Sequence, residues 1–399
     1  MRVLASAVFL LATCCALLAQ NDIPPNLLEL IDSPDRVEIP CKLHLSKPEL
    51  TFQQQYAVVV HGQFSHKLVE RGDVRHLQVL VKIKDAQGRW LVGEDYDDYK
   101  VPARLHGHDV AYSAVVYLRP GKYQVAVAIL DAESRKVNVY HDDITVEPLN
   151  NDPLPILDEL VPEVEFPTQV DDRRELWAIG DHMTSIPVTN SKPTRLDIVL
   201  NITKRFRWDA LYRIDVQNML ESGSALGRFR LAKGCVRISV LDVLRTKVIL
   251  DRFPVDRLNW TKLQESIAKI DQNVVDVHVL SNQQKVAQFT DDYLQSLAVE
   301  KGGCDANKDV FPLVVVVSPD VVLPYGNKLG SLSPLPRNEF VYVHVGWGNA
   351  WVDGIGQILG SAKPEKFNCS SPRDFRGALA KIAGLISGST PKSSMLVQH

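Results

Sequence analysis

Apolar residues recur at every second position along several short stretches in the first half of the chain. Residues 56–64 and 76–84 show this alternation most clearly, and a period of two is typical of a strand with one buried face. Three further stretches are predicted to be strands: residues 110–118, 123–129 and 137–146. Short strands at regular spacing, with little helical periodicity between them, favour a β-sandwich. We therefore predict an all-β domain over residues 37–148.

The second half of the chain alternates apolar runs of strand length with segments of helical spacing. Residues 196–200 and 311–317 are almost entirely apolar, which is typical of strands buried on both faces. Residues 236–241 and 247–253 are joined too tightly for a parallel crossover, so we expect them to pair antiparallel. Strands that alternate with helices indicate a mostly parallel sheet covered on both faces. An α/β domain is therefore predicted over residues 194–389.

Two helix starts can be recognised in this half. Ser371 followed by Pro372 predicts an N-cap and the first position of a helix. Thr261 and Gln264 have the spacing of a capping box, which predicts that another helix begins at Thr261. Apolar residues recur at helical spacing after both starts, so each helix should place one face on the sheet.

The segment between the two predicted domains and the end of the chain differ from both. Residues 149–193 hold six prolines, at positions 153, 155, 162, 167, 187 and 193. Repeated prolines without periodic apolar spacing indicate an extended linker that packs along a domain. Residues 390–399 are predicted to form a disordered tail.

The first twenty residues predict where the protein is located. Arg2 precedes an apolar run, and small residues near its end allow cleavage after Ala19 or one residue later. This is the pattern of a secretory signal peptide over residues 1–19 or 1–20, so we expect a secreted or periplasmic protein. A lipoprotein anchored through Cys14 is less favoured, because Thr13 is a poor residue before a lipidated cysteine. No later segment is long and apolar enough to predict a transmembrane span.

Composition and motifs narrow the function classes. The net charge is −3 and no Lys/Arg run interleaves with aromatic residues, so nucleic acid is not an expected partner. No G-x-S-x-G nucleophile motif occurs, and the G-x-G at residues 346–348 lacks the third glycine of a dinucleotide site. We therefore predict no catalytic residue and no cofactor.

Four cysteines remain after the predicted cleavage, and they suggest a disulfide. Cys304 and Cys369 both lie in loop-like sequence of the second half, so they are the favoured pair in an oxidising compartment. Cys235 opens an apolar strand and is predicted to be a buried free thiol. The alternative pair, Cys41 with Cys235, would link the two domains and stays open. No spacing of these cysteines indicates a zinc site.

The segment LRPGKYQVAV, residues 118–127, resembles the turn and late strand of immunoglobulin-like and fibronectin type III-like domains. In those domains a tyrosine at the start of the strand forms the tyrosine corner. The resemblance implies that the first domain is an immunoglobulin-like sandwich, and that the Tyr123 side chain bonds to backbone near the preceding loop. A domain of this kind spaces or binds other molecules.

The order of elements in the second half resembles a von Willebrand factor A-type domain. The antiparallel insert at residues 248–253 carries the resemblance, as does FVYVHVG at residues 340–346, in the place of that family's penultimate strand. The resemblance implies a Rossmann-type α/β fold. The overall character of the chain is also similar to secreted von Willebrand A-related proteins of acidobacterial type, which implies a bacterial source.

The functional site of that family is a metal-ion-dependent adhesion site. Its first element, D-x-S-x-S, corresponds here to Asn201, Thr203 and Arg205, so the aspartate is missing and an arginine replaces a ligand hydroxyl. Its second element is a threonine with no clear counterpart in residues 275–282, and its third corresponds to Asp320. Divalent cations need several hard oxygen ligands. The resemblance therefore implies a degenerate site without metal, in which Asn201, Thr203 and Asp320 are the remaining candidates.

These patterns together predict a protein–protein interaction or scaffolding protein with an unidentified protein partner, no metal and no catalysis. Two alternatives stay open. One is a hydrolase of unknown type that uses residues at strand ends: Asp320, His344 and Asp353. The other is a cell-envelope or carbohydrate-binding module built on the first domain, which would associate the protein with the envelope.

Overall fold

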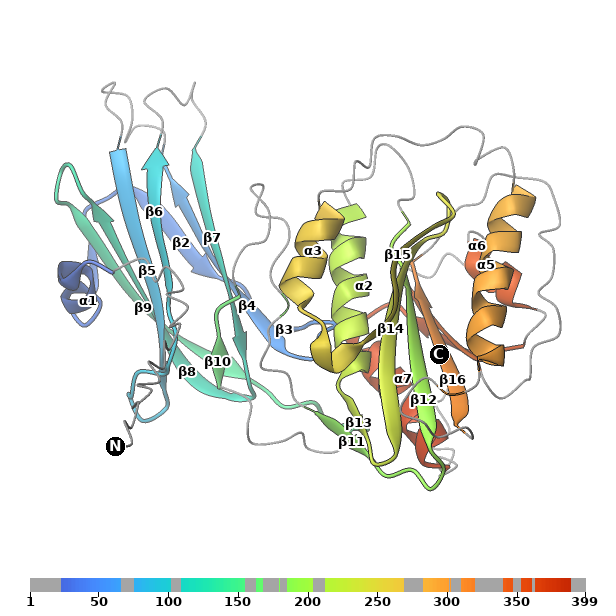
Figure 1. Cartoon of the computed structure of the whole chain (residues 1–399). Helices are drawn as coiled ribbons and strands as arrows, with labels where there is room; N and C mark the ends of the chain where they lie inside the picture. The colour runs from blue at the N-terminus through green and yellow to red at the C-terminus, as the bar shows by residue number, and fades with distance from the viewer. Residues whose placement is uncertain are drawn as a thin grey trace, which may run out of the picture.

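A computed structural model of the chain describes residues 23–65, 75–101, 109–154, 163–167, 179, 185–203, 212–268, 283–300, 302, 310–319, 340–346, 353–360 and 363–388. The predicted signal peptide (residues 1–20) and the predicted tail (residues 390–399) lie outside these ranges. Within them the protein is rich in β-strands and built of more than one domain (Figure 1).

Two five-stranded antiparallel sheets form the first domain. The first sheet has the order β1-β9-β8-β5-β6, and its strands are β1 (Arg36–Val37), β5 (Arg75–Asp85), β6 (Asp95–Val101), β8 (Gly121–Asp131) and β9 (Val137–Val146). The second has the order β10-β7-β4-β2, with β3 also paired to β4. Its strands are β2 (Cys41–Leu45), β3 (Glu49–Leu50), β4 (Tyr56–Phe64), β7 (Val110–Leu118) and β10 (Val164–Glu165).

One apolar core lies between these two sheets. Successive side chains of a strand point to opposite faces, so every second residue of β4 and β8 enters this core, Val58 and Val125 among them. This is the alternation seen in the sequence. On the outer face of the first sheet, helix α1 (Pro25–Leu30) packs Leu27 against Leu80. The first domain is thus a β-sandwich with one covered outer face.

A six-stranded sheet forms the centre of the second domain, in the order β15-β14-β12-β16-β17-β18. All neighbouring pairs are parallel except β14 and β15, which form the expected antiparallel pair. The strands are β12 (Thr194–Asn201), β14 (Gly234–Asp242), β15 (Lys247–Pro254), β16 (Phe311–Ser318), β17 (Phe340–Val345) and β18 (Glu365–Cys369).

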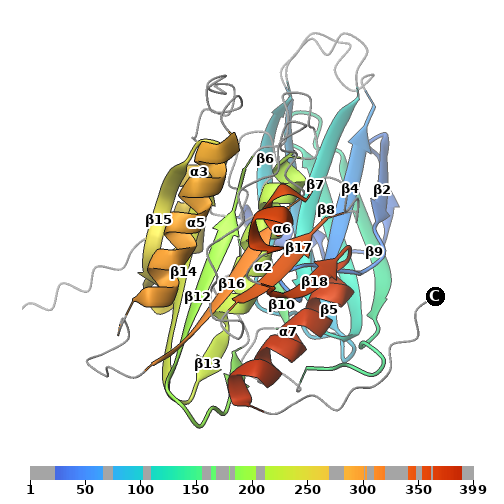
Figure 2. The ribbon, with the colours of Figure 1, turned by 90° about the vertical axis from the view of Figure 1, so that its right-hand side faces the viewer.

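Helices cover both faces of this sheet (Figures 1 and 2). One face carries α2 (Tyr212–Gly227), α3 (Trp260–Ala268) and α7 (Pro372–Ser387), which share one apolar core with the sheet. The opposite face carries α5 (Gln283–Val299) and α6 (Gly354–Leu359), which share another. A short 3-10 helix, η2 (Val255–Arg257), follows β15.

The two cores explain why the central strands read as continuous apolar runs. Ile198 of β12 belongs to the core under α2 and α7, and Val199 belongs to the core under α5. On β16, Val315 and Val316 divide in the same way. Because both faces are covered, neither face needs polar residues, and the alternation seen in the first domain disappears.

The proline-rich segment contributes strands to both domains. β10 pairs antiparallel with β7 of the sandwich. β11 (Ile186–Val188) pairs in parallel with β13 (Phe229–Leu231), next to the second domain's sheet. Ile179 is buried, and its N–H donates to Gln264 of α3 at 3.0 Å. The described parts of this segment therefore pack along the domains, as expected of such a linker.

One expected helix start is correct and the other is wrong. Ser371 caps α7 in a capping box with Asp374, and Pro372 is the first helical residue. For α3, the side chain of Asn259 accepts the N–H of Lys262 at 2.8 Å, and the helix begins at Trp260. Asn259 reaches a free N–H of the first turn, which makes it the cap in place of Thr261.

Both expected cysteine pairings are wrong. Cys369 and Cys41 are free thiols, so neither Cys304–Cys369 nor Cys41–Cys235 is formed. Cys235, which we expected to be free, is disulfide-bonded, and its partner lies outside the described residues. Cys369 ends β18 in register with Val345 and is buried in the core under α7. The loop-like sequence around Cys369 did not reveal that its side chain faces this core.

A candidate binding edge of the second domain

The parallel strands of the second domain end at one edge of the sheet, which is where open α/β sheets place their ligands. β12 ends at Asn201, and the neighbouring β16 ends at Ser318. The Asn201 Nδ2 donates a hydrogen bond to Ser318 Oγ at 3.0 Å, and both side chains are buried. We call Asn201, Thr203, Asp242 and Ser318 the strand-end cluster.

Thr203 connects this cluster to the hairpin between β14 and β15. Its hydroxyl donates to Asn201 Oδ1 at 2.6 Å and accepts the backbone N–H of Val243 at 2.8 Å. The Thr203 N–H also donates to Asn201 Oδ1, at 3.2 Å. Thr203 is therefore held from both sides, and only 2% of the residue is exposed.

Asp242 is the carboxylate of this cluster, and sequence reasoning did not single it out. Its Oδ2 accepts a 2.6 Å bond from the Arg245 side chain, and its Oδ1 accepts the Arg245 N–H at 3.2 Å. The same Oδ1 lies 3.3 Å from the Thr203 hydroxyl. The sequence did contain a signal for Asp242. A lone carboxylate at the end of an apolar strand needs a partner when it is buried, and an arginine follows three residues later.

These bonds already engage the oxygen atoms that a cation would need. Asn201 Oδ1 accepts from Thr203, and Asp242 is paired with the cationic Arg245. Within the described ranges, no group of three or more His, Cys, Asp or Glu side chains could hold a metal ion. Asp320, Arg205 and residues 275–282 lie outside those ranges. The described cluster offers hydrogen bonds and no set of free oxygen ligands.

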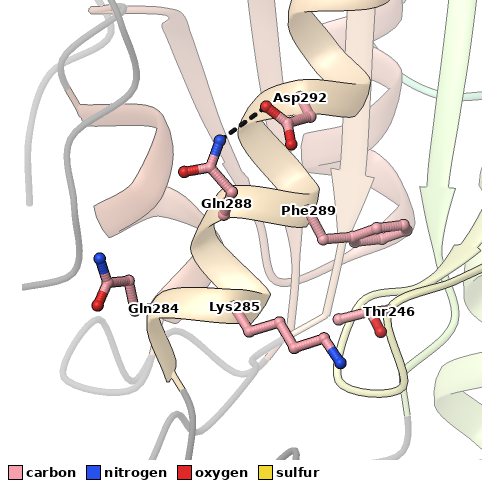
Figure 3. Close-up of a pocket in the computed structure, with 6 residues that line it drawn as sticks. All are labelled: Thr246, Gln284, Lys285, Gln288, Phe289 and Asp292. Carbon is pink, nitrogen blue, oxygen red and sulfur yellow. Dashed lines mark hydrogen bonds between the residues drawn. The ribbon is translucent and has the colours of Figure 1, made fainter.

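A shallow hollow of about 480 Å³ opens beside the hairpin turn, against the first half of α5 (Figure 3). It is lined by Thr246, Gln284, Lys285, Gln288, Phe289 and Asp292. Gln288 donates to Asp292 at 2.7 Å, and Lys285 extends toward Thr246. Two amides, both charge signs and one aromatic ring form this lining.

Two of the strand-end residues considered for catalysis, His344 and Asp353, are close enough to interact electrostatically. Asp353 accepts hydrogen bonds from the Tyr342 hydroxyl at 2.6 Å, the Gly356 N–H at 2.8 Å and Lys366 Nζ at 2.7 Å. Burial opposes ionisation of Asp353, but the bonds from Lys366 and Tyr342 outweigh it and hold the pKa of the carboxyl below its ordinary value. Asp353 therefore caps α6 and anchors neighbouring strands as a carboxylate.

A group of buried charges lies at the opposite end of the sheet. Arg195 Nε donates to Asp197 at 2.8 Å, and Arg237 Nε donates to the same carboxylate at 2.7 Å. Arg237 also forms two 2.9 Å bonds with Glu300, which lower the pKa of that carboxyl. The remaining Arg195 donors bind backbone carbonyls at the end of α5. These groups satisfy one another and fasten α5 to the sheet.

In the first domain, the hydrogen bond expected at Tyr123 is present. Its hydroxyl donates to the carbonyl of Arg119, four residues earlier in the preceding turn, at 3.0 Å. Burial raises the pKa of Tyr123 to about 12, so the hydroxyl stays a donor at every physiological pH. This contact fixes the turn between β7 and β8.

None of the described helices has the length and apolar character needed to span a membrane.

No protein-family model and no curated protein matches the chain, whereas solved structures match parts of it. The match to a glycosyl hydrolase family 2 member from Bacteroides cellulosilyticus covers 82% of this chain and 45% of the hydrolase chain, with 8% identity and a TM-score of 0.20. The chicken interferon gamma receptor alpha chain covers 27% of this chain and 51% of its own, with 15% identity and a TM-score of 0.17.

An ApaA protein from Bordetella pertussis covers 29% of this chain and 100% of its own, with 13% identity and a TM-score of 0.16. This chain spans about half the length of the hydrolase and of the receptor structure. At such TM-scores, these likenesses carry no argument about fold or function.

Proposed function

We propose that residues 194–389 form a von Willebrand factor A-type domain that follows an immunoglobulin-like sandwich. The strand order β15-β14-β12-β16-β17-β18, with one antiparallel edge pair, supports the first part. Helices on both faces of the sheet support it as well. The bond from Tyr123 to Arg119 supports the second part.

We further propose that the protein is a secreted or periplasmic interaction or scaffolding protein, which binds its protein partner without a divalent cation and without catalysis. The observation that carries this proposal is the bond from the Thr203 hydroxyl to Asn201 Oδ1. Two positions that would supply metal ligands are thereby committed to each other. The polar hollow beside the hairpin lies at the same edge, and we propose it as the place where the partner binds. The apolar run within residues 1–20 supports export.

The proposal is tested by capture of partners from an envelope extract with the full-length mature protein as bait, with and without EDTA. We expect the same partner under both conditions. The variant Lys285→Glu, which changes a residue of the hollow, should reduce capture at least severalfold. The matched variant Lys122→Glu, on an exposed position of the sandwich strand β8, should not. A partner that is lost whenever EDTA is present would contradict the metal-free part of the proposal.

The bonds of Asp353 weigh against the hydrolase alternative, because three donors already engage this carboxylate. The corresponding test is a panel of esterase, phosphatase and glycosidase substrates. We expect no turnover above background. Turnover that disappears in Asp353→Asn, with the fold retained, would overturn the non-catalytic proposal.

A further inference from the structure

The turn between β3 and β4 of the sandwich inserts into the second domain (Figure 1). Phe52 of this turn is buried in the core under α2 and α7, and its ring centroid lies 5.8 Å from that of Phe375. Gln54 Nε2 donates to the carbonyl of Pro372, the first residue of α7, at 3.2 Å. We call Phe52, Gln53 and Gln54, with the residues of α2 and α7 that they contact, the joint.

An ion pair between Arg376 of α7 and Asp152 adds to the same contact between the domains. Arg376 donates to both oxygens of Asp152, at 2.6 and 2.5 Å, and to Gln54 Oε1 at 3.3 Å. Asp152 lies just after the last long strand of the sandwich, and Arg376 is 7% exposed. Two-point binding of a carboxylate by arginine fixes direction as well as distance. The two domains therefore meet through specific polar contacts.

Glu221 of α2 completes the joint as a buried carboxyl. It is 6% exposed, and its Oε1 accepts from Gln217 Nε2 at 3.0 Å. The backbone N–H groups of Phe52 and Gln53 also bond to it. These donors favour the ionised form, but burial outweighs them and raises the pKa of Glu221 to about 7.

Other titratable groups face Glu221 from the neighbouring elements. Arg228, just after α2, faces it, and burial lowers the pKa of this guanidinium to about 9. Tyr117 of β7 faces both of them, and Glu165 of β10 lies near Arg228. Arg376 of α7 adds a second positive charge near Arg228. Arg228 therefore interacts with the negative charge of Glu165 as well as with Glu221, and it is repelled by the positive charge of Arg376.

We propose that protonation of Glu221 controls how tightly the sandwich turn is held between α2 and α7, so that the joint is a pH-sensitive coupling between the domains. Burial of an ionised carboxylate costs more free energy than burial of the neutral acid. Since the folded-state pKa is raised from 4.5 to about 7, the contribution of Glu221 to the joint is fullest below pH 4.5. It falls as the pH rises from there to about 7.

Hydrogen exchange of the full-length protein tests this inference directly. Exchange is measured at pH 5.5 and pH 8.0 and corrected for the intrinsic pH dependence, on peptides covering residues 51–55 and 372–376. We expect protection at the joint to be at least about tenfold lower at pH 8.0 than at pH 5.5, because a pKa difference of one unit between the folded and open states corresponds to a factor of about ten. In Glu221→Gln the corrected protection should be the same at both pH values. The exposed helix residue Glu265 provides the matched control, Glu265→Gln, which should behave as the wild type.

A second variant keeps the test decisive if Glu221→Gln does not fold. Gln217→Leu removes a bond that favours ionised Glu221, so it should move the loss of protection to a higher pH. Asp152→Asn weakens the joint through Arg376 and should lower protection equally at both pH values. Protection that is unchanged between pH 5.5 and 8.0 in the wild type would overturn the proposal. An equal change in wild type and Glu221→Gln would overturn it too.

Discussion

The Thr203 hydroxyl donates to Asn201 Oδ1 at 2.6 Å, inside the edge of the sheet where a ligand would bind. The same oxygen of Thr203 accepts the N–H of Val243 at 2.8 Å. A single hydroxyl thus joins the end of β12 to the hairpin after β14. The atoms that could have served as ligands therefore form hydrogen bonds within the fold.

Thr203→Val tests this structural role. Valine has nearly the same shape, but it leaves the buried Val243 N–H without its closest acceptor. We expect the free energy of unfolding to fall by about 1–3 kcal/mol, measured by urea denaturation at pH 7. The control is Thr145→Val at an exposed position of β9, which should change stability far less. Equal stability of Thr203→Val and the wild type would show that the bond contributes nothing.

Asp197→Asn should be much more damaging, because it removes the charge that Arg195 and Arg237 share. Two guanidinium groups would then remain buried with too little negative charge. The expected loss is about 3–5 kcal/mol in guanidinium chloride unfolding. Asp98→Asn removes an exposed pair with His76 and is the comparison, with little change expected. A similar small loss in both variants would contradict the role given to Asp197.

Local pattern was enough to predict much of the fold. Alternation identified β4 and β5, and the continuous run at residues 311–317 identified the buried strand β16. The site was harder, because its contacts depend on strand register. Asn201 could be placed at a strand end, whereas the contact of the neighbouring Thr203 with Asp242 at the end of β14 required the three-dimensional arrangement.

The charges within β12 show what the sequence could have revealed. Arg195 and Asp197 interrupt an apolar strand, and buried charges require partners. That argument predicts an ion pair, but it does not identify Arg237 or the end of α5 as the other participants. The cysteines illustrate the same limit, because flanking composition does not report which face of a strand a thiol occupies.

The disulfide of Cys235 can be assigned by peptide mapping under non-reducing conditions. Cys235 lies opposite Arg195 in the sheet register, and Arg195 Nη1 donates to the carbonyl of Gly302. This places the chain two residues before Cys304 close to Cys235, so we expect a peptide pair that links these two cysteines. A linked peptide that contains Cys369 would contradict the assignment.

The thiol of Cys369 should be unreactive in the native protein. Burial raises its pKa to about 12, and only 1% of the residue is exposed. Because the thiolate is the reactive form, iodoacetamide at pH 8 should modify Cys369 only after denaturation. Cys41, with a pKa raised to about 11 by burial, is the internal comparison and should also react slowly. Rapid native-state labelling of Cys369 would contradict its placement in the core under α7.

Calorimetric titration of Mg²⁺, Mn²⁺ and Ca²⁺ into the full-length mature protein tests the metal-free account most directly. The strand-end cluster has already engaged its oxygen atoms, so we predict only heats of dilution for all three cations. Asp320→Ala should give the same result as the wild type. Heat at micromolar affinity that disappears in Asp320→Ala would show that the edge still binds metal, and would contradict the account.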